Sequence, residues 1–100
     1  MTYTLKYTIH KPVVAAWFED AVPAGKYIGN AISDWMSGHP LVRSVSYNRI
    51  GPNAVQTLLG FESQEAAEQF RSEWYDNDHV KQRISYHNQQ GIADLWGSDG

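Results

Sequence analysis

The stretch that decides the fold is Leu41–Phe61, with the sequence LVRSVSYNRIGPNAVQTLLGF. In both of its halves polar residues alternate with β-branched, aromatic and other apolar residues, as they do in strands that bury one face. Between the halves, Gly51-Pro52-Asn53 supplies residues that favour a turn. The stretch therefore predicts a β-hairpin, with one strand over Leu41–Ile50 and the next over Ala54–Phe61.

A helix is predicted on each side of this hairpin. Before it, apolar residues between Tyr27 and Met36 recur at i, i+1, i+4, i+5, i+8 and i+9, which is the spacing of one helical face. After it, Ser63 has the side chain of a helix N-cap, and Ala67, Phe70 and Trp74 follow at helical spacing.

The second helix is expected to be interrupted. Asp76-Asn77-Asp78 consists of residues that prefer caps and turns to helix interiors. Helical spacing resumes in residues 80–87, and Gly91 has the character of a C-terminal cap followed by the apolar Ile92. The alternative for residues 79–90 is a strand that runs through Val80, Gln82, Ile84 and Tyr86.

The two ends of the chain complete the pattern. Tyr3, Leu5, Tyr7 and Ile9 alternate with Thr and Lys, which predicts a first strand that ends before Pro12. Residues 13–25 stay open between a helical turn after Pro12 and an irregular segment. Residues 92–96 are expected to form a short last strand, and residues 97–100 to fray. We therefore expect a single domain over residues 1–100 with the order βαββαβ.

Composition narrows the classes of function. The chain has a net charge of −3 and its Lys and Arg residues are scattered, so we expect no nucleic-acid groove. The absence of cysteine excludes disulfides, thiol nucleophiles and cysteine-bound metals. The longest apolar run, Val13–Phe18, is far below the length of about 20 residues that spans a bilayer, and no signal peptide is evident. We expect a cytoplasmic protein that does not bind membranes.

The order βαββαβ is the ferredoxin-like arrangement. Together with the Tyr-rich first strand and hairpin, it resembles the dimeric α+β barrel superfamily, which includes antibiotic-biosynthesis-type monooxygenases, muconolactone isomerases and stress-responsive barrel proteins. The resemblance covers nearly the whole chain. It implies an α+β fold with an antiparallel four-stranded sheet, helices on one face, a homodimer in which two sheets form a barrel, and a ligand cavity between each sheet and its helices.

Such a cavity would be walled by aromatic side chains and oriented by a few polar groups. A buried arginine in it would need a carboxylate or an anionic ligand as its partner. For Trp17 and Phe18, packing in the core is the alternative to lining a pocket. The side chains that we predict to contact a ligand are His10, Trp17, Phe18, Trp35, Tyr47, Arg49, Trp74 and His87.

No metal or cofactor is expected. Asp76-Asn77-Asp78 resembles the start of a calcium loop, but Lys81 and His87 stand where that loop needs Gly and Glu. Haem-degrading members of the superfamily use a His on the second helix, a Trp and an Asn on an early strand. Here Trp74 with His79 or His87 is similar in part, but the first strand has no Asn. Solvent-facing or dimer-edge positions are the alternative for both histidines.

Two functions remain open from the sequence. The first is a small-molecule-binding barrel for a hydrophobic acyl or aromatic ligand, with cofactor-independent monooxygenase or isomerase chemistry as its enzymatic forms. The second is a non-catalytic binding or stress-response module that acts through its dimer surface. Cavity-facing His, Tyr or Arg side chains would favour an enzyme, and a cavity lined only by apolar side chains would favour a binder.

Overall fold

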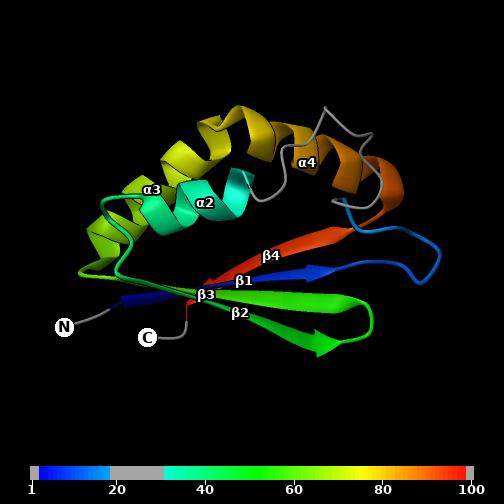
Figure 1. Cartoon of the computed structure of the whole chain (residues 1–100), viewed down its shortest axis with the longest axis horizontal. Coiled ribbons are helices and arrows are strands. Elements are labelled where there is room, and N and C mark those ends of the chain that lie inside the picture. The colour runs from blue at the N-terminus through cyan, green and yellow to red at the C-terminus, as the bar shows by residue number, and fades with distance from the viewer. Residues whose placement is uncertain (1–2, 19–30, 99–100) are drawn as a thin grey trace.

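The computed structural model of the chain describes residues 3–18 and 31–98 and shows an α+β fold in two layers (Figure 1). The strands are β1 (Tyr3–His10), β2 (Ser44–Gly51), β3 (Ala54–Phe61) and β4 (Ala93–Ser98). They form one four-stranded sheet with the order β2-β3-β1-β4, in which all neighbours are antiparallel. The helices are α2 (Ala31–Gly38), α3 (Gln64–Asp76) and α4 (Asp78–Gln90). This topology is compatible with a ferredoxin-like fold.

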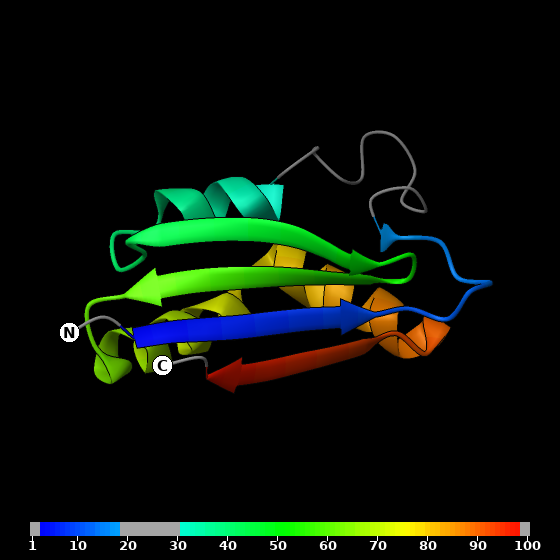
Figure 2. The ribbon, with the colours of Figure 1, turned by 90° about the horizontal axis from the view of Figure 1, so that it is seen from below.

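All the described helices lie on one face of the sheet, and Figure 2 shows the opposite face uncovered. The register of the strands determines which side chains lie on each face of the sheet. Leu5 pairs with Leu59, and Tyr7 pairs with Thr57 on one side and Trp96 on the other, so these side chains share the face under the helices. The core forms there, between this face and Ile32, Met36, Ala67, Phe70, Trp74 and Val80 of the helices.

The predicted hairpin is present, with β3 over the predicted residues Ala54–Phe61. Its first strand starts at Ser44 rather than Leu41, because the Val42 amide donates to the His39 carbonyl in a turn (3.1 Å). Pairing then begins where the Arg43 amide donates to Gly60 (2.8 Å). The register shifts between Arg49 and Gly51, at the end of the hairpin.

The interruption in the second helix is a shared cap at Asn77. Its amide donates to the Trp74 carbonyl (3.2 Å) and ends α3, while its side-chain Oδ1 accepts from the amides of His79 (2.9 Å) and Val80 (3.2 Å) and begins α4. The helical interpretation of residues 79–90 is therefore confirmed, and the strand alternative is wrong.

The chain ends need two corrections. The expected fraying at Gly97 is wrong, because Gly97 belongs to β4 and pairs with Lys6; residues 99–100 lie outside the described residues. In the open segment 13–25, the Ala15 amide donates to Pro12 (3.1 Å) in a turn, and residues 19–25 lie outside the described residues. So do residues 27–30 of the predicted first helix, whose described part is α2. Within the described residues, no helix is long and apolar enough to cross a membrane.

Candidate functional site

A cavity of about 400 Å³ lies between the sheet and the helices. Strands β1, β2 and β3 supply its floor, α2 and α4 supply its walls, and Trp17 completes the lining. The lining mixes apolar and aromatic side chains with polar ones, and Arg83 and His87 of α4 form a polar cluster in it. Its lining residues are Tyr7, Ile9, Trp17, Ser33, Met36, Tyr47, Asn48, Arg49, Val55, Gln56, Thr57, Arg83 and His87.

Arg83 brings a positive charge into this interior. It is only 7% exposed, and its Nε and Nη2 atoms are buried without a hydrogen-bond partner among the described residues. The guanidinium carbon lies 5.7 Å from the ring centre of Tyr7 and 5.9 Å from that of Trp74. The described carboxylates form no ion pair with Arg83. Its charge is thus stabilised by aromatic faces.

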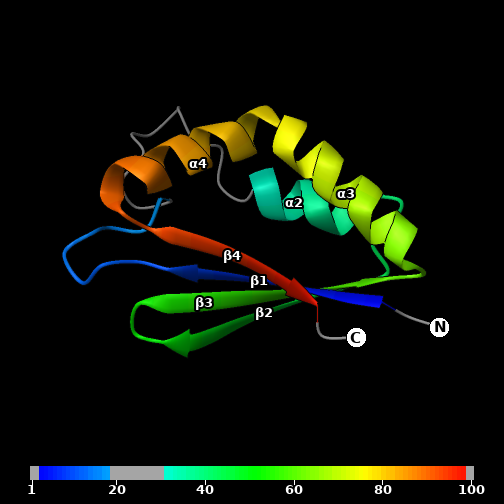
Figure 3. The same cartoon turned by 180° about the vertical axis from the view of Figure 1, so that it is seen from behind.

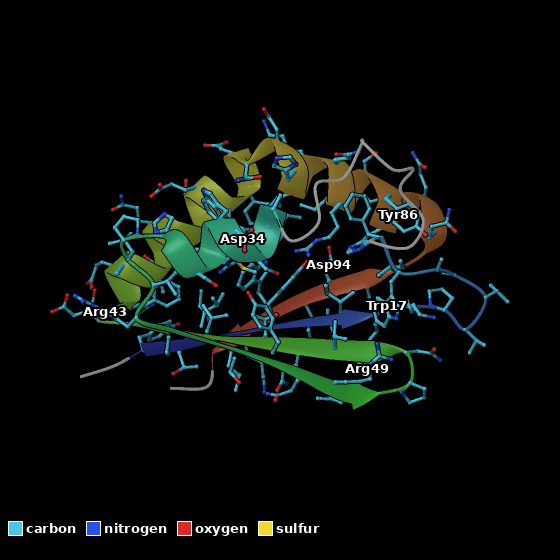
Figure 4. All side chains as sticks on the ribbon, viewed as in Figure 1. Trp17, Asp34, Arg43, Arg49, Tyr86 and Asp94 are labelled. Atoms are coloured by element: carbon cyan, nitrogen blue, oxygen red, sulfur yellow. The ribbon has the colours of Figure 1, made fainter. Side chains whose placement is uncertain are left out.

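His87 lies one helical turn after Arg83, on the same face of α4. Its side chain is 2% exposed, and its Nδ1 lies 2.8 Å from Oδ1 and 3.0 Å from Oδ2 of Asp94. Figure 4 shows Asp94 projecting from β4 into the space between the sheet and the helices. His87 lines the cavity, whereas Asp94 lines a second cavity, so the pair connects the two.

The turn between α4 and β4 brings His87 and Asp94 together. Gly91 ends α4 with a left-handed φ of 73°, and the amides of both Gly91 and Ile92 donate to the His87 carbonyl. Figure 3 shows α4 turning directly into β4 at this point. The tight connection places Asp94, the second residue of β4, beside the side chain of His87.

Tyr7 completes the polar cluster. Its hydroxyl is buried and has no hydrogen-bond partner among the described residues. Burial raises the pKa of Tyr7 far above its ordinary value; the nearby Asp94 carboxylate adds to this and the Arg83 guanidinium opposes it. The phenol therefore stays protonated and is a hydrogen-bond donor at the cavity surface.

Two more cations lie beside Trp17. Lys11 Nζ lies 5.3 Å, and the Arg49 guanidinium carbon 5.8 Å, from the ring centre of Trp17. Figure 4 shows Trp17 and Arg49 together near the turn of the β2–β3 hairpin. Arg49 is exposed, so this end of the cavity faces solvent with a positive charge.

The structure brings together only part of the predicted ligand set. Trp17, Tyr47, Arg49 and His87 line the cavity. His10 is exposed at the end of β1, on the uncovered face of the sheet. The remaining predicted side chains pack elsewhere: Phe18 against Tyr86, Trp35 against His39 and Phe70, and Trp74 against Tyr7 and Trp96.

His87 and His39 are both buried, so the solvent-facing alternative for His87 is wrong. His39 has a local role, because its Nδ1 accepts from the Leu41 amide (3.1 Å) and its Nε2 lies 3.2 Å from Glu73. Its ring also packs against Trp35 and Phe70. His39 therefore fixes the turn before β2 and lies outside the cavity lining.

Sequence reasoning missed Tyr7, Arg83 and Asp94 as site residues. Arg83 had a usable signal, since it lies three residues after Val80 and four before His87 and so shares the buried stripe of α4. For Asp94 the pattern gives no such signal, because its pairing with His87 depends on the turn at Gly91. Among the described residues, no group of three or more His, Cys, Asp or Glu side chains forms a metal site.

Three comparisons with known proteins, against family models, curated proteins and solved structures, found no match to this chain.

Proposed function

We propose that this protein binds a small molecule with an aromatic or acyl body and an anionic group in the cavity between its sheet and helices. The observation that carries the proposal is Arg83, a buried cation at the cavity surface with no anionic partner among the described residues. Moving such a charge out of water costs several kcal/mol, which a bound carboxylate or similar group offsets.

The rest of the cavity suits the body of this ligand. Trp17, Tyr47, Met36 and Val55 provide aromatic and aliphatic walls, and a volume of about 400 Å³ falls within the range of small-molecule sites. Arg49 and Lys11 at the Trp17 end attract anions to the entrance. The proposed ligand is therefore amphipathic, with its anionic group toward α4.

The test is a titration with 1-anilinonaphthalene-8-sulfonate, an aromatic probe with a sulfonate group. We expect saturable binding that Ser33→Phe weakens at least about tenfold, about 1.4 kcal/mol, because a phenyl ring on α2 fills the cavity. Ser37→Phe is the matched control: it lies one turn further along α2, is exposed and does not line the cavity.

Near-UV circular dichroism of each variant should match that of the wild type, since the probe also binds loosely packed states. Equal binding to Ser33→Phe and the wild type would place the probe outside the cavity and contradict the proposal.

We also propose that two copies pair through the uncovered sheet face to form a dimeric α+β barrel. The face opposite the helices carries Leu58 and Leu95, and Leu95 is 53% exposed although it lies on a regular strand. An antiparallel sheet with apolar side chains on an uncovered face buries them by packing against a second layer. A second copy, with the same face, supplies that layer.

Light scattering after size exclusion should give about twice the chain mass of 11.3 kDa. Leu95→Lys should yield monomers, because it places two desolvated cations in a shared interface. Val14→Lys, at a loop residue that is 96% exposed, should leave the dimer intact. A wild-type monomer at micromolar concentration would refute the barrel.

A further inference from the structure

We propose that His87 is a catalytic base and that the cavity isomerises oxo acids, moving a proton on a carbon next to a carbonyl group. This inference rests on the proposed ligand site and names its substrate class: aromatic or acyl compounds in which an enolisable ketone adjoins a carboxylate. Its basis is the juxtaposition, at one end of one cavity, of an oriented imidazole with a buried cation and a buried phenol.

The contact with Asp94 determines which ring nitrogen of His87 can act as the base. Both carboxylate oxygens lie within 3.0 Å of His87 Nδ1, so this nitrogen carries the proton and donates it to Asp94. Nε2 is then the nitrogen with a free lone pair, and it belongs to the edge of the ring that is turned from Asp94. Because His87 lines the cavity, that lone pair is available to a bound molecule.

The two donors stand where the reaction develops negative charge. Arg83 precedes His87 by one turn on the same face of α4, and Tyr7 reaches the cavity from β1. The buried Nε and Nη2 of Arg83 and the buried hydroxyl of Tyr7 have no partner among the described residues. Donors held in a site of low dielectric stabilise an enolate far more than water does.

The step balances within the substrate. Nε2 of His87 takes the proton from the carbon beside the carbonyl, and the electron pair of that C–H bond becomes the C=C bond of the enolate. The carbonyl π electrons move onto oxygen, whose negative charge Arg83 and Tyr7 stabilise. The imidazolium then returns the proton to the oxygen or to the carbon, giving the enol or the ketone, so nothing is oxidised or reduced.

Asp94 is a positioning residue in this scheme, since it acts only through His87. It fixes the tautomer and stabilises the imidazolium that forms when Nε2 takes the proton. A second, smaller cavity of about 340 Å³, lined by Asp94, Trp74 and Trp96, lies on the other side of the pair. Asp94 is 19% exposed there, so the carboxylate stays solvated while the imidazole is buried.

The experiment follows hydrogen–deuterium exchange by proton NMR in D₂O, at the methylene group beside the ketone of phenylpyruvate and of 2-oxooctanoate. We expect the wild-type protein to accelerate exchange, and His87→Gln to lower the protein-catalysed rate about 100-fold or more, the usual contribution of a general base. Asp94→Asn should lower the rate while leaving the affinity for the same acids within a few fold, which a merely structural pair would not do.

Controls separate chemistry from binding. His79→Gln changes the other histidine of α4, which does not line the cavity, and should leave the rate unchanged. 3-Phenylpropionate keeps the carboxylate and the ring but lacks the ketone, so it should bind without exchange. If His87→Gln fails to fold, Asp94→Asn provides the test. A slower exchange rate with unaltered affinity in that variant supports the catalytic role of His87.

The outcomes distinguish the two proposals. Acids that bind to the wild type yet exchange no faster than in buffer overturn the catalytic role of His87 and leave the ligand site standing. Exchange that is equal in His87→Gln and the wild type also overturns it. Failure of all three acids to bind overturns the ligand site, and the inference with it.

Discussion

Arg83→Met is expected to abolish tight binding of anionic ligands without weakening the fold. In the proposed complex the buried guanidinium meets the anionic group of the ligand, and a hydrogen bond to a charged group contributes about 1.5–3 kcal/mol. Affinity for anilinonaphthalene sulfonate or 3-phenylpropionate should therefore fall roughly 10- to 150-fold. Affinity for an uncharged aromatic of the same size should change little.

The expected stability of Arg83→Met follows from two opposed contributions to the free energy of unfolding. Methionine removes the stacking of the Arg83 charge on Tyr7 and Trp74, which is worth about 2 kcal/mol when desolvated. It also removes the desolvation cost of a buried cation that has no ion-pair partner among the described residues, and this cost is several kcal/mol. The second term is the larger, so the urea midpoint of the ligand-free variant should equal or exceed that of the wild type.

Arg43→Met is the matched control. Arg43 pairs with Glu62 at 3.0 Å, but both side chains are exposed (61% and 76%), and such pairs contribute at most about 1 kcal/mol. Figure 4 places Arg43 at the end of the molecule far from Trp17 and Arg49. If Arg83→Met unfolded several kcal/mol more easily and kept its affinity, Arg83 would be a structural residue and the ligand site would be disproved.

The sequence predicts local structure well wherever neighbouring residues determine it. Asn77 caps through its own side chain, Gly91 ends α4 by its left-handed φ, and residues 54–61 form β3 because alternation puts one face in the core. The ends of an element are hard to predict where pairing with a distant strand determines them. Gly97 stays in β4 because Lys6 of β1 pairs with it, and no local signal in residues 97–100 contains that information.

The candidate site was predicted only in part, for a related reason. His87 was identified from the stripe of α4, but its role depends on Asp94, a residue on another element that the turn at Gly91 brings within 2.8 Å. Tyr7 was missed because alternation marked only a buried face. Arg83 was missed because a charged side chain between Val80 and His87 is expected to be solvated, whereas it is buried. The proposed role of these groups rests on their burial without a partner among the described residues, and partners are a property of the folded chain.

Trp17 and Trp74, two of the three tryptophans in the predicted ligand set, should differ sharply in the effects of their substitution. Trp74 is 1% exposed, lies 5.2 Å from the ring centres of both Tyr7 and Trp96, and belongs to the core. Trp74→Ala is therefore expected to lower the free energy of unfolding by about 3–5 kcal/mol, the usual cost of an aromatic deletion in a core. For a domain with a total stability of about 5–15 kcal/mol, this is a large share.

Trp17→Ala should have a small effect on stability and a clear effect on ligand affinity. Trp17 is half-buried and its ring faces the cavity between Lys11 and Arg49, so its main losses are two exposed cation–π contacts of about 0.5–1 kcal/mol each. Affinity for an aromatic anion should fall about 2- to 10-fold, because an aromatic pair adds about 0.5–1.5 kcal/mol. Urea unfolding followed by far-UV circular dichroism, which does not depend on tryptophan fluorescence, measures the first effect, and calorimetric titration with 3-phenylpropionate measures the second.

The comparison tests the position of the cavity itself. If the ligand lies between the sheet and the helices at the Trp17 end, only Trp17→Ala loses affinity while the fold is retained, and the loss in Trp74→Ala follows its unfolding. Binding that survives in Trp17→Ala but disappears in a folded Trp74→Ala protein would instead place the ligand in the smaller cavity beside Trp74 and Asp94. In that case the Asp94 side of the His87–Asp94 pair, and not the His87 side, would face the bound molecule.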